Sequence, residues 1–433
     1  MIKNKGNFKE ATKELKKSSS TAHLYSKESK ISGPLSGTTI TIKDLYSTSD
    51  APTQASSKIL EGFNSGYDAE IVKKIKAAGA TIIAKVHLDE LALGGTGQFN
   101  AYSKIDNPLN KDRIIGGSSS GSAATFTKSI GLSIGSDTGD SIRLPASYNG
   151  LYGFKPSYGA ISRYGQFAYA SSLDTVGYFA HNVHDIIEIS NVLFGVDKMD
   201  MTSRRVEKPE HKIIKPKIIG FIKNSNGVPK YLLNQYEILK KQFKKDEIEI
   251  IEFEIDQILL DNIDVVYQAI SYSEASSNDS NLTGISFGVS KDGKDWNEIM
   301  HNTRSKLFGE LVQRRFTLGA YFLSNENLVS VFQKSQKVRR LIVDAFNNIK
   351  NQVDLFVFPA TTIAPLKTEK KLSTWLNSIL INSNFSGAPS LVIPWGTHEN
   401  MPFGLAMEAS LYEDKKLLSH ALYVEKLLGG DNE

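Results

Sequence analysis

Two stretches rich in glycine and serine are the first candidates for chemistry in this sequence. They are GGSSSGSAA, from Gly116 to Ala124, and GSDTGDSIRLPAS, from Gly135 to Ser147. Small residues of this kind usually make turns, but successive backbone N–H groups on such a turn can converge on one oxyanion. The first run also opens a segment typical of a helix, where free N–H groups point outward. The sequence therefore predicts a site in which serine hydroxyls and backbone N–H groups do the chemistry.

A lysine near the N-terminus is the third candidate. The segment TTITIKD, from Thr38 to Asp44, is rich in β-branched residues and predicts a strand that ends in Lys43. An ammonium group at the end of a buried strand is costly unless it is paired or functional. We therefore count Lys43 among the candidate site residues.

Three other motifs are weaker. GISFG, from Gly284 to Gly288, matches a nucleophile elbow, but that motif needs a strand before it and a helix after it, and here both flanks are typical of loops. HNVH offers His181 and His184 at metal-ligand spacing, yet no Cys, His or Glu cluster stands near them in sequence, so we expect a surface or helix-start role and no metal. GGTG at Gly94 lacks the spacing of a phosphate-binding loop.

Helix and strand patterns alternate along the chain, as in residues 68–86, 231–255 and 326–360. Such alternation favours an α/β fold, which we expect to be a single large domain with a mixed, mostly parallel β-sheet flanked by helices. We assign residues 36–433 to this domain and residues 1–35 to an N-terminal helical or flexible segment. The most polar stretch, near residues 199–217, predicts a connection rather than an element.

Composition excludes several classes of protein. The chain of 433 residues has no cysteine, which excludes disulfides, cysteine-ligated zinc and a cysteine nucleophile. Its net charge of +4 is too weak to predict a nucleic-acid surface. No apolar run approaches the length of a membrane span, about 18 residues, and the charged N-terminus is unlike a signal peptide. We therefore expect a cytoplasmic protein.

The motifs together resemble a known family. GGSSSGSAA, GSDTGDSIRLPASYNGLYGFKPSYG and the upstream TIKD are similar to the motifs of the amidase signature family, and the similarity runs from about Ser36 to Leu428. Further segments resemble one branch, the A subunits of glutamyl-tRNA(Gln) amidotransferases. These segments are ISRYGQFAYASSLDTVGYFAHNVHD, EASSN, ELVQRRFTLGAYFLS and FSGAPSLVIPWG. In that branch the subunit releases ammonia from glutamine for a partner subunit.

The resemblance maps the family's catalytic triad onto Lys43, Ser118 and Ser141, with a cis peptide bond at Ser118 and Ser141 as nucleophile. Serine needs a base within hydrogen-bond reach, and Lys43 is the base available, since these motifs contain no histidine. To accept a proton near pH 7, its pKa must fall from about 10.4 by roughly three units, on the order of 4 kcal/mol. Ser118 is expected to relay the proton between Ser141 and Lys43.

The same resemblance implies that Thr138, Gly139 and Asp140 donate backbone N–H groups to an oxyanion. One such donor is typically worth about 2.7–4 kcal/mol. Asp140 stands where the family usually has glycine, and a carboxylate facing the oxyanion would raise the barrier, so we expect this side chain to point away. Ser120 also replaces a common glycine, and the spacing between the two catalytic serines is one residue shorter than usual.

Substrate-binding residues follow from the resemblance as well. Arg315 matches the arginine expected to hold the α-carboxylate of glutamine, for which a bidentate guanidinium is suited, and Arg314 is the alternative. The family's acidic partner for the α-ammonium group falls at Asn377, which can accept a hydrogen bond but carries no charge. Arg143 and Asp137 are expected to brace the loop against each other.

The resemblance also implies partners. We expect a tRNA-binding B subunit of the amidotransferase, which would use ATP and Mg²⁺, and a small C subunit. Glutamine would be the substrate of this chain, and Glu-tRNA(Gln) would be reached only through the complex. We expect no cofactor, no metal and no membrane contact for this chain itself.

Two other classes of function stay open. A free-standing amidase acting on another small amide is favoured by Asn377, whereas the EASSN and ASSLD segments oppose it. A catalytically silent scaffold role within the complex is favoured by Asp140, but the presence together of Lys43, Ser118 and Ser141 opposes it.

Overall fold

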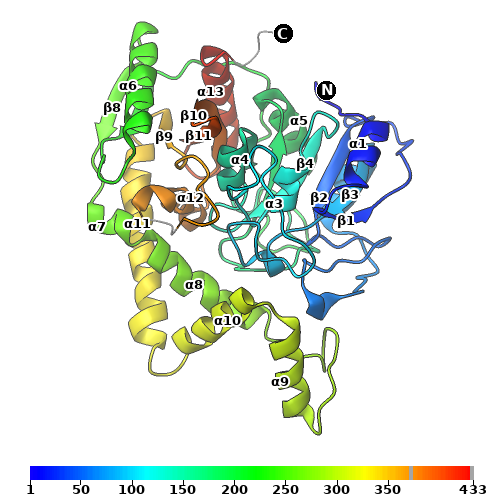
Figure 1. Ribbon diagram of the computed structural model, residues 1–433. Helices are drawn as coiled ribbons and strands as arrows, with labels where there is room; N and C mark the ends of the chain where they lie inside the picture. The colour runs from blue at the N-terminus through cyan, green and yellow to red at the C-terminus, as the bar shows by residue number, and fades with distance from the viewer. Residues whose placement is uncertain (370–373, 430–433) are drawn as a thin grey trace.

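The computed structural model describes residues 1–369 and 374–429. Its strands form one sheet, in the order β1-β3-β2-β4-β6-β5-β10-β11-β9-β7-β8, and helices cover both faces (Figure 1). The strands are β1 Thr21–Leu24, β2 Thr39–Lys43, β3 Thr81–Val86, β4 Leu132–Asp137, β5 Tyr152–Lys155, β6 Thr175–Ala180, β7 Ile218–Ile222, β8 Glu249–Phe253, β9 Leu355–Pro359, β10 Ser390–His398 and β11 Met401–Glu408.

Helices of very different lengths connect these strands. The α-helices are α1 Phe8–Leu15, α2 Glu70–Ala77, α3 Ser120–Ala124, α4 Arg143–Asn149, α5 Val183–Leu193, α6 Lys230–Lys245, α7 Gln257–Asp261, α8 Ile263–Asn278, α9 Trp296–Leu307, α10 Glu310–Phe322, α11 Lys334–Lys350, α12 Asn382–Ser386 and α13 Asp414–Leu427. Short 3-10 turns occur at η1 Lys58–Leu60, η2 Glu90–Ala92, η4 Trp375–Asn377 and η5 Ile379–Ile381, and η3 Leu328–Gln333 is a π-helix.

The sheet is mixed, as expected, but the expectation that it is mostly parallel was wrong. Parallel pairing joins β2 to β3 and β4, and β7 to β8 and β9. Every other neighbouring pair of strands is antiparallel. One antiparallel pair, β10 and β11, is a hairpin whose turn residues Glu399 and Asn400 have positive φ, and such a tight turn returns the chain antiparallel. The other five antiparallel pairs join strands that are far apart in sequence or linked by a long loop, so tertiary packing sets their direction.

The helix–strand units predicted from periodicity are confirmed. In the first unit α2 buries Ile71, Val72 and Ile75 on one face, and the chain then turns at Gly79, whose φ is +86°. This left-handed conformation is a common end for a helix because glycine has no Cβ to clash. The strand β3 that follows is buried at every position. The units α6–β8 and α11–β9 repeat the order of helix and then strand, with β9 buried at every position and β8 half-buried or exposed along its length.

The N-terminal segment contributes to the sheet. Residues 1–35 contain α1, which the Asn7 side chain caps, and β1, which pairs antiparallel with β3 at the edge. The division of the chain near residue 35 stays a prediction. The polar stretch at residues 199–217 contains no helix or strand, as expected of a connection.

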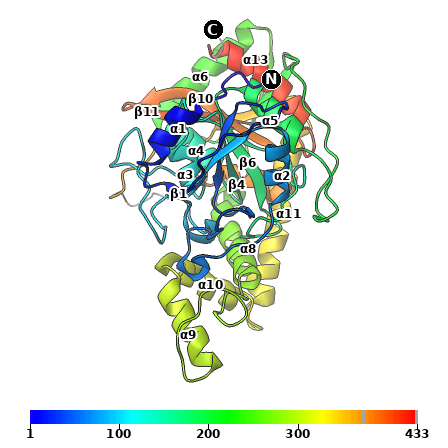
Figure 2. The ribbon, with the colours of Figure 1, turned by 90° about the vertical axis from the view of Figure 1, so that its right-hand side faces the viewer.

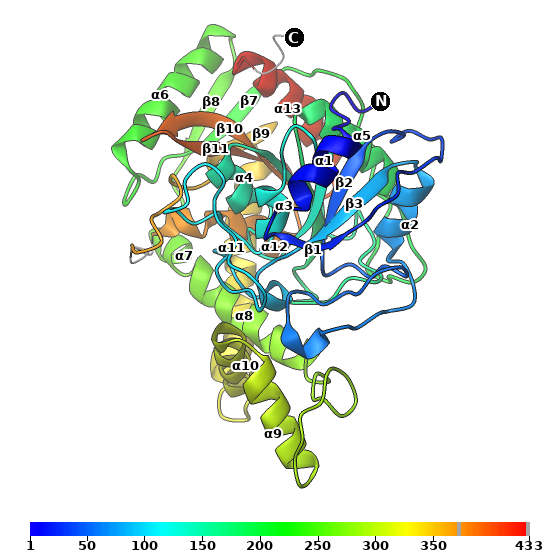
Figure 3. The same ribbon diagram turned by 45° about the vertical axis from the view of Figure 1, so that its right-hand side comes forward.

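Two layers of helices enclose the central strands, and a helical extension projects from them. Figure 2 shows α1, α3 and α4 on one side of β4 and β6, with α2 and α5 on the other. From the sheet, α8 and α10 run outward together to α9, which lies at the tip of the extension (Figures 1 and 3). No helix within the described part of the chain combines the length and apolarity needed to span a bilayer.

Candidate active site

Two neighbouring parallel strands bring the lysine to the serines. Because β2 and β4 run parallel, with Ile42 opposite Ile134, their carboxyl ends lie at the same edge of the sheet. Lys43 is the last residue of β2 and is fully buried. Its Nζ donates hydrogen bonds to Ser118 Oγ at 2.8 Å, Ser136 Oγ at 2.9 Å and Ser119 Oγ at 3.1 Å. The predicted pair of Lys43 and Ser118 is therefore in direct contact.

The surroundings of Lys43 favour its neutral form. Burial lowers the pKa of the Lys43 ammonium to about 7, whereas the charges of Asp89, Asp137 and Asp174 raise it, in that order. None of these three carboxylates forms an ion pair with Nζ, whose hydrogen-bond partners are the three hydroxyls. A hydroxyl can accept from an ammonium or donate to an amine. Lys43 can therefore act as a base near neutral pH without breaking its contacts.

The first serine run is fixed to the end of β4 by Ser119. Its Oγ donates to Ser136 O at 3.0 Å, and its backbone N–H donates to Ser141 O at 3.3 Å. The preceding peptide bond, between Gly117 and Ser118, is cis, as the resemblance implied. The helix expected after this run is present as α3, although it is only five residues long. Ser118 and Ser141 thus lie on adjacent segments, with exposed fractions of 0% and 4%.

The turn after β4 carries the residues predicted to bind an oxyanion. Thr138 Oγ1 donates to Asp174 Oδ1 at 2.7 Å, which ties the turn to the neighbouring loop. Gly139 lies under the ring of Tyr267, so that a Cβ at this position would approach the ring carbon Cζ to 2.9 Å. Only glycine fits this contact without displacing Tyr267, which closes one side of the turn. No measured distance tests the predicted N–H donors, which stay a prediction.

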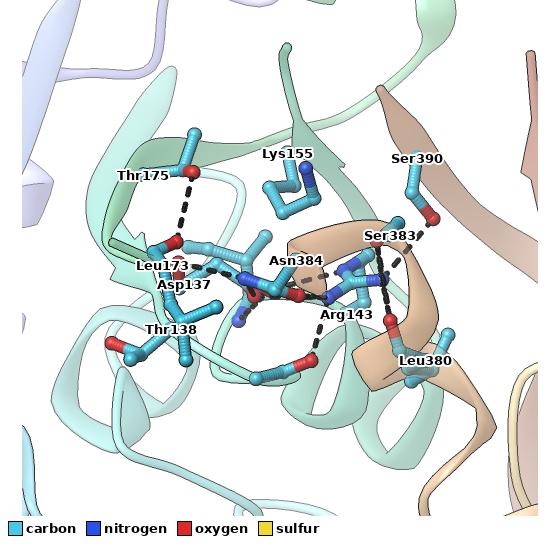
Figure 4. A network of polar contacts seen from close by, with 12 residues as sticks. Asp137, Thr138, Arg143, Lys155, Leu173, Thr175, Leu380, Ser383, Asn384 and Ser390 are labelled. Atoms are coloured by element: carbon cyan, nitrogen blue, oxygen red, sulfur yellow. Dashed lines mark hydrogen bonds and ion pairs between the residues drawn. The ribbon is translucent and has the colours of Figure 1, made fainter. Parts of the chain in front are cut away.

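Arg143 holds this turn in place, as Figure 4 shows. Its Nη2 donates to Asp137 Oδ1 at 2.9 Å and to Gly139 O at 2.8 Å, and its Nε donates to Asp137 Oδ2 at 3.1 Å. Burial raises the pKa of Asp137, but the charge of Arg143 and its hydrogen bonds, together with the charge of Lys155 and the N–H of Ile142, outweigh burial, and the net pKa is lowered. The expectation that these two residues brace the loop is confirmed.

The same guanidinium joins the turn to the C-terminal part of the chain. Arg143 Nη1 donates to Leu380 O at 2.6 Å and Ser383 Oγ at 2.7 Å, and Nη2 donates to Asn384 Oδ1 at 2.6 Å. These partners lie in η5 and α12, more than 230 residues away in sequence. The position of the turn is thus set by contacts that no local motif contains.

Asp140, the departure from glycine, is half-buried at the start of the turn into α4. Its backbone carbonyl accepts a hydrogen bond from Leu144 N at 2.8 Å. Its charge acts on the hydroxyls of Tyr148 and Tyr267, which come from different parts of the chain. The expectation that its carboxylate faces away from the oxyanion stays a prediction.

Arg315 lies half-buried on α10, with its guanidinium carbon 4.9 Å from the centre of the Tyr272 ring. Its Nη1 donates to Tyr169 Oη at 3.2 Å, while its Nε is buried and has no hydrogen-bond acceptor among the described residues. Its charge also acts on Tyr267, the residue that covers Gly139. Arg315 therefore has an N–H group beside the turn that can still donate a hydrogen bond to a ligand.

The other predicted substrate residues differ in their surroundings. Arg314, the alternative to Arg315, is exposed. Asn377 is half-buried at the end of η4, and its backbone N–H donates to Thr374 O at 3.0 Å. Its expected role toward an α-ammonium group stays a prediction.

The EASSN and ASSLD segments contact each other beside the site. Glu274 accepts hydrogen bonds from Ser172 N at 2.9 Å and Ser172 Oγ at 2.6 Å. Asn278 Nδ2 donates to Tyr169 O at 3.1 Å. Asp174 closes the same loop by accepting from Tyr169 N at 2.8 Å. Helix α8 therefore fixes the loop that carries Tyr169 and Asp174.

Our sequence reasoning missed several residues of the site. Ser119 and Ser136 belong to the two quoted runs, and the density of hydroxyls there was a signal for them. Asp89, in the loop after β3, donates its backbone N–H to Ser118 O. The GGTG motif, which follows it in the sequence, was the feature that could have pointed to Asp89. The N–H groups of Thr96 and Gly97 donate to its Oδ2 at 3.1 and 3.0 Å. This glycine loop thus binds an internal carboxylate, not a phosphate.

The remaining motifs lie outside the site. GISFG forms a loop with an exposed Ser286, as its flanks indicated. His181 Nε2 makes a hydrogen bond with Ile130 O at 2.8 Å, and His184 lies in the first turn of α5, which confirms the expected helix-start position.

Comparison with known proteins gives a consistent result. The family model described as Amidase matches residues 4–418. The chain is 36% identical to the A subunit of glutamyl-tRNA(Gln) amidotransferase from Mycoplasma genitalium, over 96% of this chain and 92% of that protein. It is also 36% identical to the corresponding A subunit from Sulfolobus acidocaldarius, over 97% of this chain and 89% of that protein.

Solved structures agree. The crystal structure of the glutamyl-tRNA(Gln) amidotransferase A subunit from Thermotoga maritima superposes with a TM-score of 0.81 at 29% identity, covering 98% of this chain and 91% of that one. The native peptide amidase from Stenotrophomonas maltophilia superposes with a TM-score of 0.77 over 92% of this chain and 83% of that one. At 22% identity the second likeness shows the fold alone.

Proposed function

This chain belongs to the Amidase family, and on that premise we propose that it hydrolyses glutamine and supplies the ammonia to a tRNA-dependent amidotransferase. The observation that carries the proposal is the near full-length similarity to the A subunits of glutamyl-tRNA(Gln) amidotransferases. It is joined by a buried lysine in contact with a serine of the family motif. The chain is accordingly an amidase-type enzyme.

The first chemical step uses the three residues of the triad. The Oγ of Ser141 attacks the γ-carboxamide carbon of glutamine while its proton passes to Ser118, and the proton of Ser118 passes to neutral Lys43. The lowered pKa of Lys43, about 7, supports this direction of transfer. General-base catalysis of this kind typically contributes about 10²–10⁴-fold to a rate.

The tetrahedral intermediate then carries a negative oxygen. Backbone N–H groups of Thr138, Gly139 and Asp140 stabilise it, because preorganised donors at a buried site need no reorganisation as the charge develops. Collapse of the intermediate breaks the C–N bond, and the protonated Lys43 returns its proton through Ser118 to the leaving ammonia. Water hydrolyses the resulting γ-glutamyl ester of Ser141 to glutamate.

Recognition of glutamine falls to Arg315 on the helical extension and to Asn377 at the end of η4. The unpartnered Nε of Arg315 supports binding of the α-carboxylate, since a guanidinium can donate two parallel hydrogen bonds to it. Asn377 accepts from the α-ammonium group without adding a charge. Tyr267 packs between Arg315 and the catalytic turn, which is consistent with a substrate that reaches from one to the other.

The ammonia is used by partners of this chain. A tRNA-binding B subunit holds Glu-tRNA(Gln) and uses ATP and Mg²⁺ to activate the glutamate for amidation, and a small C subunit completes the complex. This chain supplies neither the nucleotide site nor the tRNA site. The net charge of +4 supports that division, because it offers no strongly basic surface for tRNA.

The direct test is glutamate release from glutamine by the purified complex, with wild type beside Ser141→Ala. We expect release to fall to background in this variant, because no hydroxyl remains to form the ester. Ser122→Ala is the matched control. Ser122 is a buried serine of the same run, but its hydroxyl donates to Ile134 O at 3.1 Å and makes no recorded contact with Lys43.

Each result is informative. Release that persists in Ser141→Ala would put the nucleophile elsewhere. No release even from the wild-type complex with Glu-tRNA(Gln) would favour another amide substrate or a silent scaffold, and hydrolysis of simple amides would then distinguish these two.

A further inference from the structure

On the side of β4 and β6 opposite α3 and α4, three metal-ligand side chains meet beside α5 (Figure 2). His184 and Glu188 stand four residues apart on the helix, and His211 comes from the polar connection at residues 199–217. One ligand atom from each of the three lies within 4.8 Å of the other two. His211 Nε2 is 2.6 Å from Glu188 Oε1, and the two imidazole rings stack with centroids 4.0 Å apart.

A carboxylate orients the first of these rings. His184 Nδ1 lies 3.5 Å from Oδ1 of Asp185, which is fully buried and held by the backbone N–H groups of Lys3 and Asn4 at 2.7 and 3.1 Å. A carboxylate at Nδ1 favours the tautomer in which Nε2 is free to bind a metal, and metal-binding histidines commonly have such a partner.

We propose that His184, Glu188 and His211 form a binding site for a divalent transition metal of the zinc type. Two imidazoles and one carboxylate are a donor set that suits Zn²⁺. The three side chains are partly exposed, at 21%, 15% and 37%, so an ion can reach them from solvent. The amino group of Met1 lies 2.8 Å from Glu188 Oε1, and the ion would displace this contact.

Binding requires a small rearrangement. Ligands about 2.1 Å from a tetrahedral zinc are roughly 3.4 Å apart. His211 Nε2 and Glu188 Oε1, now 2.6 Å apart, must therefore separate slightly, while donor atoms that lie up to 4.8 Å apart must draw closer. The stacked rings must also open, because an ion lies in the plane of each imidazole that binds it. His211 can make this movement, since it is the most exposed of the three and lies in a connection without helix or strand.

The bound ion would crosslink separate segments of the chain. It would join α5 to the connection through His211 and, through Asp185, to the N-terminal backbone at Lys3 and Asn4. Because the ion binds the folded chain and not the unfolded one, it would stabilise this corner of the fold. The site lies apart from the proposed glutaminase chemistry and does not depend on it.

The test is Zn²⁺ binding to the full chain, purified without a histidine tag and stripped with a chelator. Isothermal titration calorimetry should detect one site, and Co²⁺ should give the visible absorption of a tetrahedral complex. Thermal unfolding should shift upward by about 3 °C at a Zn²⁺ concentration 100 times the Kd. The variants His184→Gln and His211→Gln should each bind about 100-fold more weakly.

His181→Gln is the matched control, because His181 belongs to the same HNVH motif but makes its ring contact with Ile130 O. It should bind Zn²⁺ as the wild type does. Circular dichroism of every variant checks that loss of binding is not loss of fold, and His211, in its exposed loop, offers the variant with least effect on folding. Wild-type binding weaker than about 10⁻⁴ M, or equal binding by His211→Gln, would overturn the proposal.

Discussion

The protonation of Lys43 makes the sharpest prediction about the activity of this enzyme. Lys43 Nζ is buried among three serine hydroxyls, and burial lowers its pKa to about 7 from the 10.5 of a free lysine. Only the neutral amine can accept the proton of the nucleophile. We therefore expect kcat/KM for glutamine hydrolysis to rise with pH and to level off above the pKa of Lys43.

The size of the effect follows from this pKa. The neutral fraction is one half at pH 7, about one tenth at pH 6 and about one hundredth at pH 5, so the rate should fall roughly tenfold per pH unit below neutrality. The same shift bears on stability. Because the folded state binds fewer protons than the unfolded state between pH 7 and 10.5, Lys43 destabilises the fold by about 5 kcal/mol below pH 7. That cost disappears as the pH rises to 10.5.

The assay is glutamate release by the purified complex from pH 5.5 to 9. Lys43→Met removes the base in a similar volume and should lower kcat/KM by about 10²–10⁴-fold. Lys155→Met is the matched control. Lys155 is equally buried with a pKa lowered to about 7, but its Nζ donates to Ala388 O and Pro156 O and not to a serine. This variant should keep the wild-type inflection.

One acidic group could imitate the inflection. Burial raises the pKa of Asp174 to about 6, and its carboxylate accepts from Thr138 on the catalytic turn. In Asp174→Asn the inflection should remain and move only slightly below that of the wild type, because the charge of Asp174 is the smallest of the three that raise the pKa of Lys43. An inflection that disappears in Asp174→Asn, or a Lys43→Met variant with nearly wild-type activity, would refute the assignment of Lys43 as the base.

Three further predictions concern arginines and a neutral substrate contact. Arg143→Met should lower the free energy of unfolding by about 3–5 kcal/mol in urea titrations, since Asp137 would be left buried without its partner; a loss below about 1 kcal/mol would contradict this account. Arg315→Lys should raise KM for glutamine about tenfold or more with a smaller change in kcat, whereas Arg314→Lys, the exposed neighbour, should have wild-type kinetics. Asn377→Asp should lower KM about tenfold, because a charge-assisted hydrogen bond to the α-ammonium group would replace a neutral one; an unchanged KM would remove this residue from the substrate site.

Local features of the fold were readable from the sequence because they depend on neighbours along the chain. The helical spacing of apolar residues and the position of Gly79 predicted the α2–β3 unit, and β-branched residues predicted the strand that ends in Lys43. The proportion of parallel to antiparallel strand pairs could not be predicted from the sequence, since the same apolar run suits a parallel or an antiparallel strand. Tertiary packing decided the strand directions, because five of the six antiparallel pairs join strands with no tight turn between them.

The candidate site divides in the same way. The resemblance of short, specific motifs to those of the amidase signature family predicted the triad of Lys43, Ser118 and Ser141 from sequence. The tertiary structure alone brought Lys43 to Ser136, through the parallel pairing of β2 and β4. Residues that act across long separations had no local signal, since contact between them depends on topology and not on spacing.

Arg143 and His211 illustrate this limit. The sequence indicated that Arg143 braces Asp137 six residues away, but not that it also donates to Leu380 O at 2.6 Å, 237 residues away. Likewise, the HNVH motif drew attention to His184, but no sequence feature predicted that His211 would stack on it, because that contact forms only when the connection packs against α5. Chemistry carried by adjacent residues is determined by sequence, whereas the burial and the distant contacts that set pKa, orientation and ligand geometry are decided only by the packed fold.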